Sequence, residues 1–256
     1  MKQVIAPVIS NTKITSSFYQ MWLEAPQIVS EAKPGQFVMV HCGSDTVLPR
    51  PLSIHRLDGS RLALLFTVVG KGTAWLAQRR AGDSINILGP LGNGFSIHSA
   101  SQKLLMVAGG MGIAPLYFMA QEALKKELSV TLLYGTAVKN PYPEDHLTPG
   151  IKLITATEDG SVGHHGLVTD LLPEFTDWAD QVFVCGPMSM YREMALKKKE
   201  FKLEGKPVQV SLEVRMGCGR GVCYGCTIKT KNGLKKVCQD GPVFDRDDIL
   251  WDELNY

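Results

Sequence analysis

Short apolar runs separated by turn residues fill the first hundred positions of the chain. The segments QFVMVHC, LSIHRL, RLALLFTVV and SINILGPLG are rich in Val, Ile, Leu and Phe, and the turn sequences KPGQ, LDGS and RAGD lie between them. Several short strands at this spacing predict a small antiparallel β-barrel. The segment GTAWLAQRR predicts one helix, between Thr73 and Arg80, that caps this barrel.

The pattern changes from about Lys103 onward. KLLMVA is a continuous apolar run, as expected of a strand buried on both faces of a parallel sheet, and a segment with helical periodicity follows it. Strand-like SVTLLYG, IKLITAT and QVFVC then alternate with helix-like segments, the last of them MSMYREMALKKKEF. This alternation predicts a doubly wound α/β domain with a parallel sheet. We therefore expect a barrel domain (1–100), an α/β domain (101–208) and a small C-terminal module (209–256).

Composition excludes several classes of protein. Of the 256 residues 45% are hydrophobic and 20% charged, which is ordinary for a soluble globular protein. A net charge of +2 gives no reason to expect nucleic acid or a membrane surface as a partner. No apolar run is long enough to cross a bilayer, and the first residues, MKQVIAPVIS, lack the apolar core of a signal peptide. These features predict a cytoplasmic protein.

Four of the six cysteines are crowded between Arg215 and Gly241, in the segment RMGCGRGVCYGCTIKTKNGLKKVCQDG. A disulfide scaffold, a zinc site and an iron–sulfur cluster are the three interpretations, and a reducing cytosol places the disulfides last. The spacing is C-x4-C-x2-C-x11-C, close to the plant-type ferredoxin pattern. A four-thiolate zinc site is the alternative, but such sites usually contain paired C-x2-C motifs and only one is present here. The cluster ligands are then Cys218, Cys223, Cys226 and Cys238.

Glycines and a hairpin explain how this segment could surround a cluster. Glycines at 217, 219, 221 and 225 let the backbone fold tightly and direct amides at sulfur. The sequence TIKTK-NG-LKKV predicts a hairpin with a type I′ turn at Asn232-Gly233. Such a hairpin would bring Cys226 and Cys238 together at its base.

Two glycine motifs mark the expected α/β domain. GGMG, with Gly109, Gly110 and Gly112, lies between a buried strand and a helix, where backbone amides can bind a pyrophosphate. It is not the G-x-G-x-x-G fingerprint, and a tight strand-to-helix turn is the alternative. VCGP ends the last strand of the domain and places Cys185 at the ligand crevice, although a lone cysteine is more often a small buried residue.

Two further motifs lie in the expected barrel. In RPLS, Arg50 offers a planar fork for phosphate and Ser53 offers a hydroxyl for a cofactor edge. GKGT, from Gly70 to Thr73, opens the capping helix with a flexible turn and is a second candidate pyrophosphate site. Each motif alone would be a common surface loop.

Together, RPLS, GKGT, GPLGNGF, GGMGIAP and CGP resemble, in order and spacing, the ferredoxin–NADP reductase superfamily over residues 1 to 208. The resemblance implies an FAD-binding barrel followed by a nicotinamide-dinucleotide domain. It implies that Cys185 flanks the nicotinamide and that Ser53 forms a hydrogen bond near the reactive flavin nitrogen, or serves structure alone. The implied dinucleotide site contains Gly109, Gly110 and Gly112, and the implied FAD site contains Arg50, Pro51, Leu52, Ser53, Leu65, Phe66, Thr67, Gly72 and Thr73.

With the cysteine module and the segments VCQDGPVF and EDGSVGHHGLVTDLL, the whole chain resembles the electron-transfer subunits of class B dihydroorotate dehydrogenases. That resemblance implies FAD, a [2Fe–2S] cluster, NAD as co-substrate and a role in pyrimidine biosynthesis. The implied partner is an FMN-containing subunit that oxidises dihydroorotate, in a heterotetramer of two copies of each. The alternatives are a related reductase subunit for a hydrogenase, sulfide or oxygenase partner, and a zinc-stabilised binding module that is not an enzyme.

The remaining charged and aromatic residues receive simpler interpretations. YGTAVKN lacks an arginine that could bind a 2′-phosphate, which favours NAD, although Lys139 weakens this. The lysines of the expected hairpin are interpreted as a solvated face. The tail with Phe244, Leu250 and Trp251 could pack on a partner or on its own domain. All six histidines are interpreted as solvated or core residues: His41, His55, His98, His146, His164 and His165.

Overall fold

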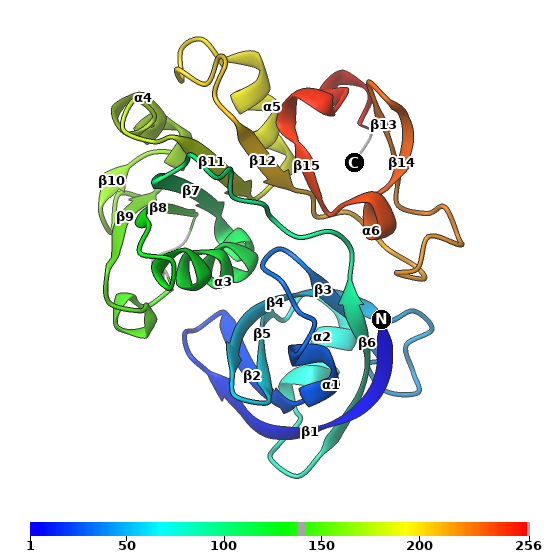
Figure 1. Ribbon diagram of the computed structural model, residues 1–256. Coiled ribbons are helices and arrows are strands. Elements are labelled where there is room, and N and C mark those ends of the chain that lie inside the picture. Colours follow the sequence, from blue (N-terminus) through cyan, green and yellow to red (C-terminus); the bar gives the residue numbers. More distant parts are fainter. Residues whose placement is uncertain (138–141, 255–256) are drawn as a thin grey trace.

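A closed six-stranded barrel forms the first part of the computed structural model, which describes residues 1–137 and 142–254 (Figure 1). Its strand order is β1-β2-β5-β4-β3-β6, and every neighbouring pair is antiparallel. The expected antiparallel barrel is therefore confirmed. The strands are β1 (Lys2–Lys13), β2 (Phe18–Glu24), β3 (Phe37–Val40), β4 (Arg50–Asp58), β5 (Arg61–Thr67) and β6 (Ser84–Leu91).

The apolar runs of the sequence correspond to β3 to β6 and do not reveal β1 and β2. In β1 only Ala6 and Val8 are buried, because most of this strand lies on the outside of the barrel. Its place depends on pairing with β2 and β6, and this pairing is a property of the closed barrel. The capping helix α2 spans Lys71–Ala77, shifted toward the N-terminus from the expected Thr73–Arg80. The shift arises because the Thr73 hydroxyl accepts the Val69 N–H (2.9 Å), which places Thr73 inside the first turn.

A seven-stranded sheet forms the second part, in the order β10-β9-β8-β7-β11-β12-β15. All its pairs are parallel except β12–β15, and β7 and β11 are buried almost throughout, as their apolar sequences predict. The strands are β7 (Lys103–Gly109), β8 (Ser129–Thr136), β9 (Ile151–Thr157), β10 (His164–His165), β11 (Gln181–Cys185), β12 (Val208–Ser211) and β15 (Val243–Asp245).

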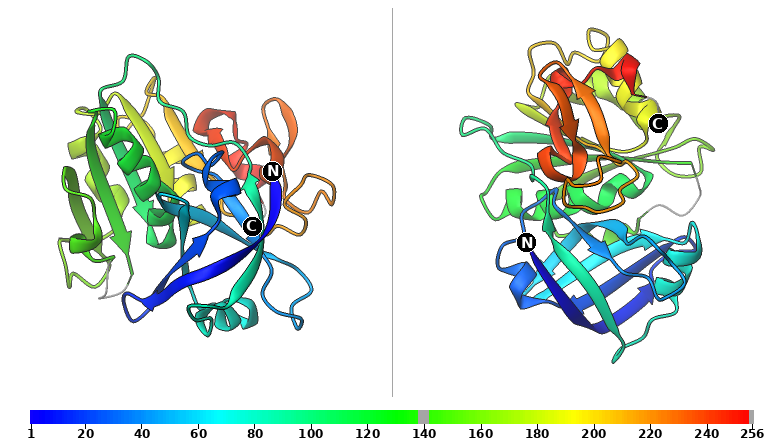
Figure 2. Two further views of the ribbon diagram at one scale, coloured as in Figure 1. Left: turned by 60° about the horizontal axis from the view of Figure 1, so that its bottom comes forward. Right: turned by 90° about the vertical axis from the view of Figure 1, so that its right-hand side faces the viewer.

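Helices cover both faces of this sheet, which confirms the expected α/β architecture (Figure 2). From β7 the chain proceeds outward to β8, β9 and β10, then returns to the other side of β7 to form β11 and β12. The order of the strands thus reverses between β7 and β11, and ligands of open α/β sheets bind at the carboxyl ends of strands at such a point. The helices are α1 (Pro26–Val29) in the barrel region, and α3 (Ile113–Leu124), α4 (Leu172–Phe175) and α5 (Met188–Leu196) around the sheet.

The cysteine segment contains the expected hairpin, formed by β13 (Thr227–Thr230) and β14 (Gly233–Lys236), followed by the short helix α6 (Val237–Asp240). The predicted turn type is wrong. Thr230 pairs with Gly233, so the two loop residues are Lys231 and Asn232. Gly233 has a φ of 87°, but Asn232 is not among the described non-glycine residues with positive φ. A type I′ turn needs positive φ at both central residues, whereas this loop resembles a turn closed by a glycine bulge.

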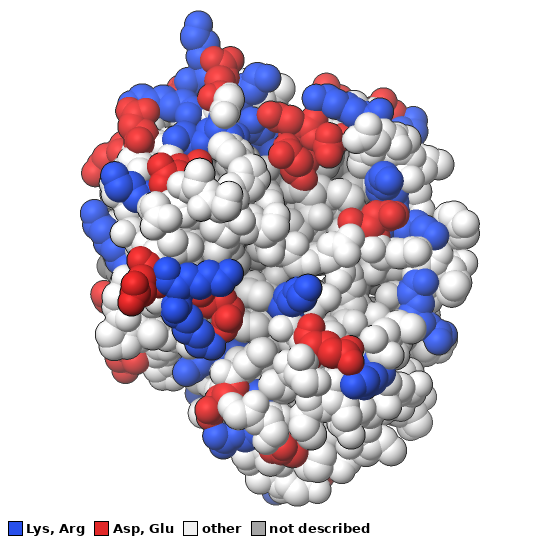
Figure 3. Space-filling model, in the orientation of Figure 1, with Lys and Arg blue, Asp and Glu red and all other residues white. Residues whose placement is uncertain are grey.

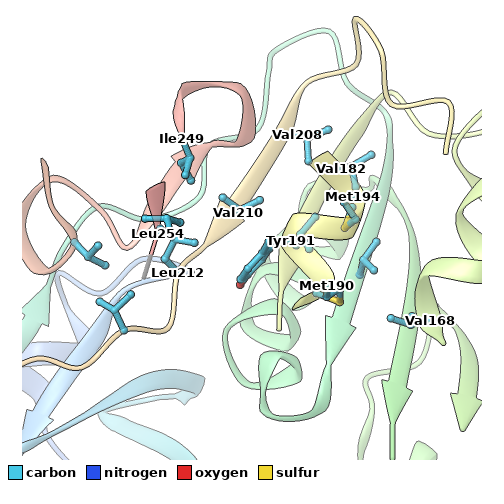
Figure 4. Packing of buried hydrophobic residues seen from close by; sticks show 14 of the residues in the cluster. Val168, Val182, Met190, Tyr191, Met194, Val208, Val210, Leu212, Ile249 and Leu254 are labelled. Atoms are coloured by element: carbon cyan, nitrogen blue, oxygen red, sulfur yellow. The ribbon is translucent and has the colours of Figure 1, made fainter. Parts of the chain in front are cut away.

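The C-terminal tail packs on its own chain. Trp251 stacks on Tyr191 of α5, with ring centroids 5.6 Å apart, and Leu254 is buried beside Leu212 (Figure 4). The Arg192 side chain also donates to the Leu254 carbonyl. From the sequence, this tail could pack on a partner or on its own domain. In the structure it packs on its own domain.

The three-domain division at residues 100 and 208 stays a prediction. β15, from the expected C-terminal module, extends the sheet of the expected α/β domain by pairing with β12. None of the helices in the described part of the chain has the length and apolarity needed to span a bilayer.

Candidate functional site

A cavity of about 430 Å³ lies along the carboxyl ends of the sheet strands. Gly109 and Gly110 line it directly after β7, and Gly110 has a φ of 54° with no atom within 4 Å of where a Cβ would stand. Gly112 does not line the cavity. A Cβ there would lie 1.9 Å from the Cys185 carbonyl oxygen, so this glycine lets the start of α3 pack against the end of β11. We call this space the dinucleotide cavity.

A second cavity, of about 270 Å³, lies between the barrel and the sheet and is called the flavin cavity below. Strands β4 and β5 and the start of α2 provide its barrel side. Most of the residues that the resemblance assigns to FAD line it: Pro51, Leu52, Ser53, Leu65, Phe66, Thr67 and Thr73. The lining is mainly apolar, with the hydroxyls of Ser53, Thr67 and Thr73 among it.

Arg50 and Gly72 complete the expected FAD set but do not line the cavity. The Arg50 guanidinium donates to the Leu48 carbonyl (2.6 Å), and its Nε lies 2.9 Å from the place of a Cβ on Gly72. The structure therefore brings the RPLS and GKGT motifs into contact, as a common phosphate site would require. Only glycine leaves room for this guanidinium at position 72.

The two cavities share part of their walls. Met111 and Glu213 line both of them, one following β7 and the other following β12. Neither residue was predicted. Glu213 could have been found, because it directly follows the alternating apolar segment VQVSL and so lies at the carboxyl end of a strand.

Glu213 is exposed to the open space of the two cavities that it lines, and protein atoms crowd the other side of its carboxyl. This desolvation raises the pKa of the carboxyl, while a hydrogen bond from the Cys185 thiol (3.7 Å) lowers it by less. Cys185 is fully buried behind the cavity wall, and burial followed by the nearby Glu213 charge raises the pKa of its thiol. The predicted Cys185 thus reaches the cavities only through Glu213.

Tyr191 holds the strand ends that carry these two residues. Its buried hydroxyl accepts the Gly186 N–H (2.9 Å) and donates to the Ser211 carbonyl (2.5 Å). Gly186 follows Cys185, and Ser211 is two residues before Glu213. The ring of Trp251 stacks on Tyr191, so the C-terminal tail packs against the residue that links these two strand ends.

The four clustered thiols surround the glycine-rich loop. Cys226 and Cys238 are buried at the base of the hairpin, as predicted, and the Cys238 N–H points at the Cys226 sulfur (3.4 Å). Cys218 and Cys223 form a second neighbouring pair, and Cys223 is exposed. Across residues 1–137 and 142–254, no three His, Cys, Asp or Glu side chains stand close enough together to hold one metal ion.

Backbone amides point at the thiols, as sulfur ligands of a cluster require. The Gly221 N–H approaches the Cys238 sulfur (3.1 Å), and the Arg220 N–H approaches the Cys218 sulfur (3.4 Å). Burial raises the pKa of the Cys218 thiol, but hydrogen bonds from N–H groups, that of Arg220 first, outweigh burial and lower it to about 6. The loop therefore favours thiolate at this position.

Both ends of the thiol segment border the flavin cavity. Met216, two residues before Cys218, and Pro242, four residues after Cys238, line it. The segment also packs on the barrel, because a Cβ on Gly219 would lie 2.4 Å from Cγ of Met39. Figure 2 shows this segment, in orange and red, beside both the barrel and the sheet.

The remaining expectations have mixed outcomes. His55 is a buried core residue, as one interpretation required, while His164 and His165 are exposed. Lys229 forms an ion pair with Glu253 (2.5 Å), and side chains of both charges are interspersed on the face seen in Figure 3. Lys139, the residue that weakened the preference for NAD, lies outside the described residues.

Comparison with known proteins identifies relatives over the full length. The chain is 39% identical to the "Dihydroorotate dehydrogenase B (NAD(+)), electron transfer subunit" of Desulforamulus reducens, covering 96% of this chain and 98% of the relative. It is 36% identical to the subunit of the same name from Clostridium acetobutylicum, covering 95% of both chains. Residues 213–250 match the family model of the iron–sulfur cluster binding domain of dihydroorotate dehydrogenase B.

Solved structures agree in fold. A chain of an NADH-dependent reduced ferredoxin–NADP oxidoreductase, studied for flavin-based electron bifurcation, superposes with a TM-score of 0.87 at 30% identity, covering 98% of this chain and 91% of that one. Phthalate dioxygenase reductase superposes with a TM-score of 0.62 at 17% identity, covering 90% and 87% of the two chains. With relatives this similar over their whole length, the chain belongs to the family of electron-transfer subunits of NAD-dependent dihydroorotate dehydrogenase B, and it is an oxidoreductase subunit.

Proposed function

We propose that this chain accepts electrons from the FMN of a separate dihydroorotate-oxidising subunit and delivers them to NAD⁺, through a [2Fe–2S] cluster and an FAD that it binds itself. One observation carries the proposal. The flavin cavity is lined by Met216 and Pro242, at the ends of the thiol segment, and also by Met111 and Glu213, which it shares with the dinucleotide cavity. The three expected sites therefore adjoin in the order that the route needs.

The flavin cavity fits FAD by its shape and chemistry. A lining that is mainly apolar but carries the hydroxyls of Ser53, Thr67 and Thr73 suits a flat ring with a polar edge. We assign the Ser53 hydroxyl to that edge and the Arg50 guanidinium, beside Gly72, to the pyrophosphate. When bound, FAD exchanges a hydride with NAD and single electrons with the cluster, which carries one electron at a time.

The dinucleotide cavity fits NAD at its glycine turn. Gly110 leaves the cavity open beside its Cα, and the backbone N–H groups at the start of the twelve-residue helix α3 offer donors for a pyrophosphate. At the wall shared with the flavin cavity, Cys185 orients the Glu213 carboxyl. Because nearby protein atoms raise the pKa of the Glu213 carboxyl, this group takes up a proton more readily than a free carboxyl, at a place beside both ring systems.

The thiol segment fits a [2Fe–2S] cluster, which takes four thiolates with two on each iron. We assign Cys218 and Cys223 to one iron and Cys226 and Cys238 to the other, in keeping with the two neighbouring pairs. The amide donors at 220 and 221 would then stabilise the negative charge on the sulfurs.

The partner is proposed to be an FMN-containing catalytic subunit, in a cytoplasmic heterotetramer of two copies of each chain that serves pyrimidine biosynthesis. The exposed Cys223 lies between Val222 and Tyr224, whose side chains are 69% and 66% exposed. Apolar side chains this accessible beside a cluster ligand support a subunit contact on this side.

Anaerobic purification tests the proposal. We expect stoichiometric FAD, two irons and two inorganic sulfides per chain, and NADH should bleach the flavin and produce the electron-spin resonance signal of a reduced cluster. Zinc without iron, or a chain without flavin, would contradict it. Co-expression with a catalytic subunit should give dihydroorotate-driven NAD⁺ reduction, and its absence would favour a reductase for another partner.

A further inference from the structure

Lys236, the last residue of β14, departs from the solvated face expected of the hairpin lysines. The residue is half-buried, and its Nζ donates to the Gly221 carbonyl (3.0 Å) in the glycine-rich loop between the thiols. The same ammonium group lies over the ring of Tyr224, 4.9 Å from the ring centroid. One side chain of the hairpin therefore contacts the loop at two points, on either side of Val222 and Cys223.

Both ends of the contact between Lys236 and Gly221 are held in place. The Asp240 carboxylate accepts the Lys236 backbone N–H (2.7 Å), which fixes the lysine where the chain passes from β14 into α6. Gly221 is buried with a φ of 73°, and a Cβ on it would overlap Oε1 of Gln239. The hydrogen bond thus joins the hairpin to the loop at a place that is fixed on both sides.

The peptide group that carries the Gly221 carbonyl also reaches a thiol. Its N–H belongs to Val222 and is among the amides that hydrogen-bond to the Cys218 thiol and lower its pKa. The N–H of Gly221 itself, on the preceding peptide, approaches the Cys238 sulfur (3.1 Å). A cation bound to a carbonyl polarises the peptide and strengthens its N–H as a donor. A single peptide group therefore links Lys236 to Cys218.

The positive charge of Lys236 has no carboxylate partner in the described part of the chain. Its Nζ forms no ion pair within residues 1–137 and 142–254, whereas Lys229, on the facing strand, pairs with Glu253. The two contacts of the ammonium group are with a carbonyl oxygen and an aromatic ring, and both leave its net charge intact. A cation held in this way makes the electrostatic potential at the loop more positive.

We infer that Lys236 is a positioning residue for the cluster of the proposed function and raises the reduction potential of that cluster. The inference rests on the proposed assignment of the four thiols to the cluster. One-electron reduction adds a negative charge to the iron–sulfur unit, so a fixed cation and stronger amide donors stabilise the reduced form more than the oxidised form. An electron from the partner's flavin would then enter the cluster more readily.

The test compares Lys236→Met with the wild-type full chain, both purified anaerobically with FAD and cluster. Redox titration followed by electron-spin resonance gives the cluster potential, and flavin absorbance gives the FAD potential of the same sample. We expect the equilibrium constant for cluster reduction to fall about tenfold in Lys236→Met, which is a potential about 59 mV lower for one electron. The FAD potential should not change, because Lys236 lines neither cavity.

Two further variants separate the contact from charge in general. Lys236→Arg keeps a cation with N–H donors and should stay close to the wild-type cluster potential. Lys235→Met removes the same charge from the neighbouring position of β14, where strand alternation directs the side chain to the opposite face of the hairpin. This variant should shift the cluster potential much less than Lys236→Met does.

An unchanged cluster potential in Lys236→Met, or an equal fall in Lys235→Met, would overturn the inference. If Lys236→Met did not retain its cluster, Lys236→Gln would take its place, because it keeps a donor for the loop without the charge, and its potential is read in the same way. Loss of the cluster from both neutral variants but not from Lys236→Arg would support the inference, and loss from Lys236→Arg as well would overturn it. A wild-type chain that binds no cluster would show that the proposed function itself fails, and the inference with it.

Discussion

The thiol of Cys185 lies 3.7 Å from Oε1 of Glu213, behind the wall that the flavin and dinucleotide cavities share. The cysteine ends β11 and the glutamate follows β12, so parallel pairing of these two strands brings them together. Through this contact the buried Cys185 thiol donates to and orients the Glu213 carboxyl, which faces both cavities.

Cys185→Ala should slow the reduction of FAD by NADH about tenfold, because Glu213 loses the donor that orients it. Cys185→Ser keeps a donor and should stay close to the wild-type rate. Stopped-flow bleaching measures both, with iron content determined in parallel. Iron lost from Cys185→Ala would show that this cysteine binds metal and that the cluster assignment is wrong.

Arg50→Ala should purify with FAD depleted and bind it about tenfold to a hundredfold more weakly, because a guanidinium–phosphate contact is lost. Arg79→Ala is a matched control, since Arg79 lies just after α2 and stacks on Trp75 (4.2 Å) away from Gly72. Fluorescence titration of the apoprotein with FAD measures both affinities. Full occupancy and unchanged affinity in Arg50→Ala would remove Arg50 from the site.

His55 ties the barrel to the α/β part and should make stability depend on pH. Its Nδ1 donates to the Ala114 carbonyl (3.1 Å), so its Nε2 accepts the Tyr142 hydroxyl (3.0 Å) as a neutral ring. Burial, with smaller effects from Arg56 and His146, lowers the pKa of His55 to about 3.

The direction of this pH dependence follows from the linkage between proton binding and folding. An unfolded histidine takes up a proton near pH 6.5, but the folded one does so only near 3, so folded stability falls as the pH drops between these values. We expect the stability advantage of the wild type over His55→Gln to shrink over this interval, by at most about 1.4 kcal/mol per pH unit. Urea unfolding at a series of pH values measures it, and an advantage that does not change with pH would contradict the neutral buried ring.

Features carried by local sequence were predictable. The hairpin expected from TIKTKNGLKKV brought Cys226 and Cys238 together, and the RPLS and GKGT motifs, with the resemblance that they support, led to most of the barrel residues that line the flavin cavity. Glu213 was missed because the motifs do not include it, and only the strand order shows that it lies at the wall shared by the two cavities.

The wrong turn type also has its origin in tertiary structure. The Asn232-Gly233 pair does not set the hairpin turn, because the pairing of Thr230 with Gly233 shifts the loop by one residue. The contact of the Arg50 guanidinium with Gly72 likewise depends on the fold, because it joins motifs twenty-two positions apart, and the role of Arg50 at FAD stays a prediction.

The central claim is that the cluster is the obligatory relay between the partner's flavin and FAD. Cys226→Ser tests it, because this buried ligand itself lines neither the dinucleotide cavity nor the flavin cavity. Retained FAD and normal bleaching by NADH serve as the internal control for folding.

The decisive measurement is dihydroorotate-driven NAD⁺ reduction by the complex reconstituted with Cys226→Ser, with loss of the cluster verified by electron-spin resonance. The account predicts that NADH still reduces the FAD while coupling to dihydroorotate falls to the background without this subunit. Coupling at the wild-type rate with the cluster absent would contradict the relay and leave the cysteine module as a structural dock.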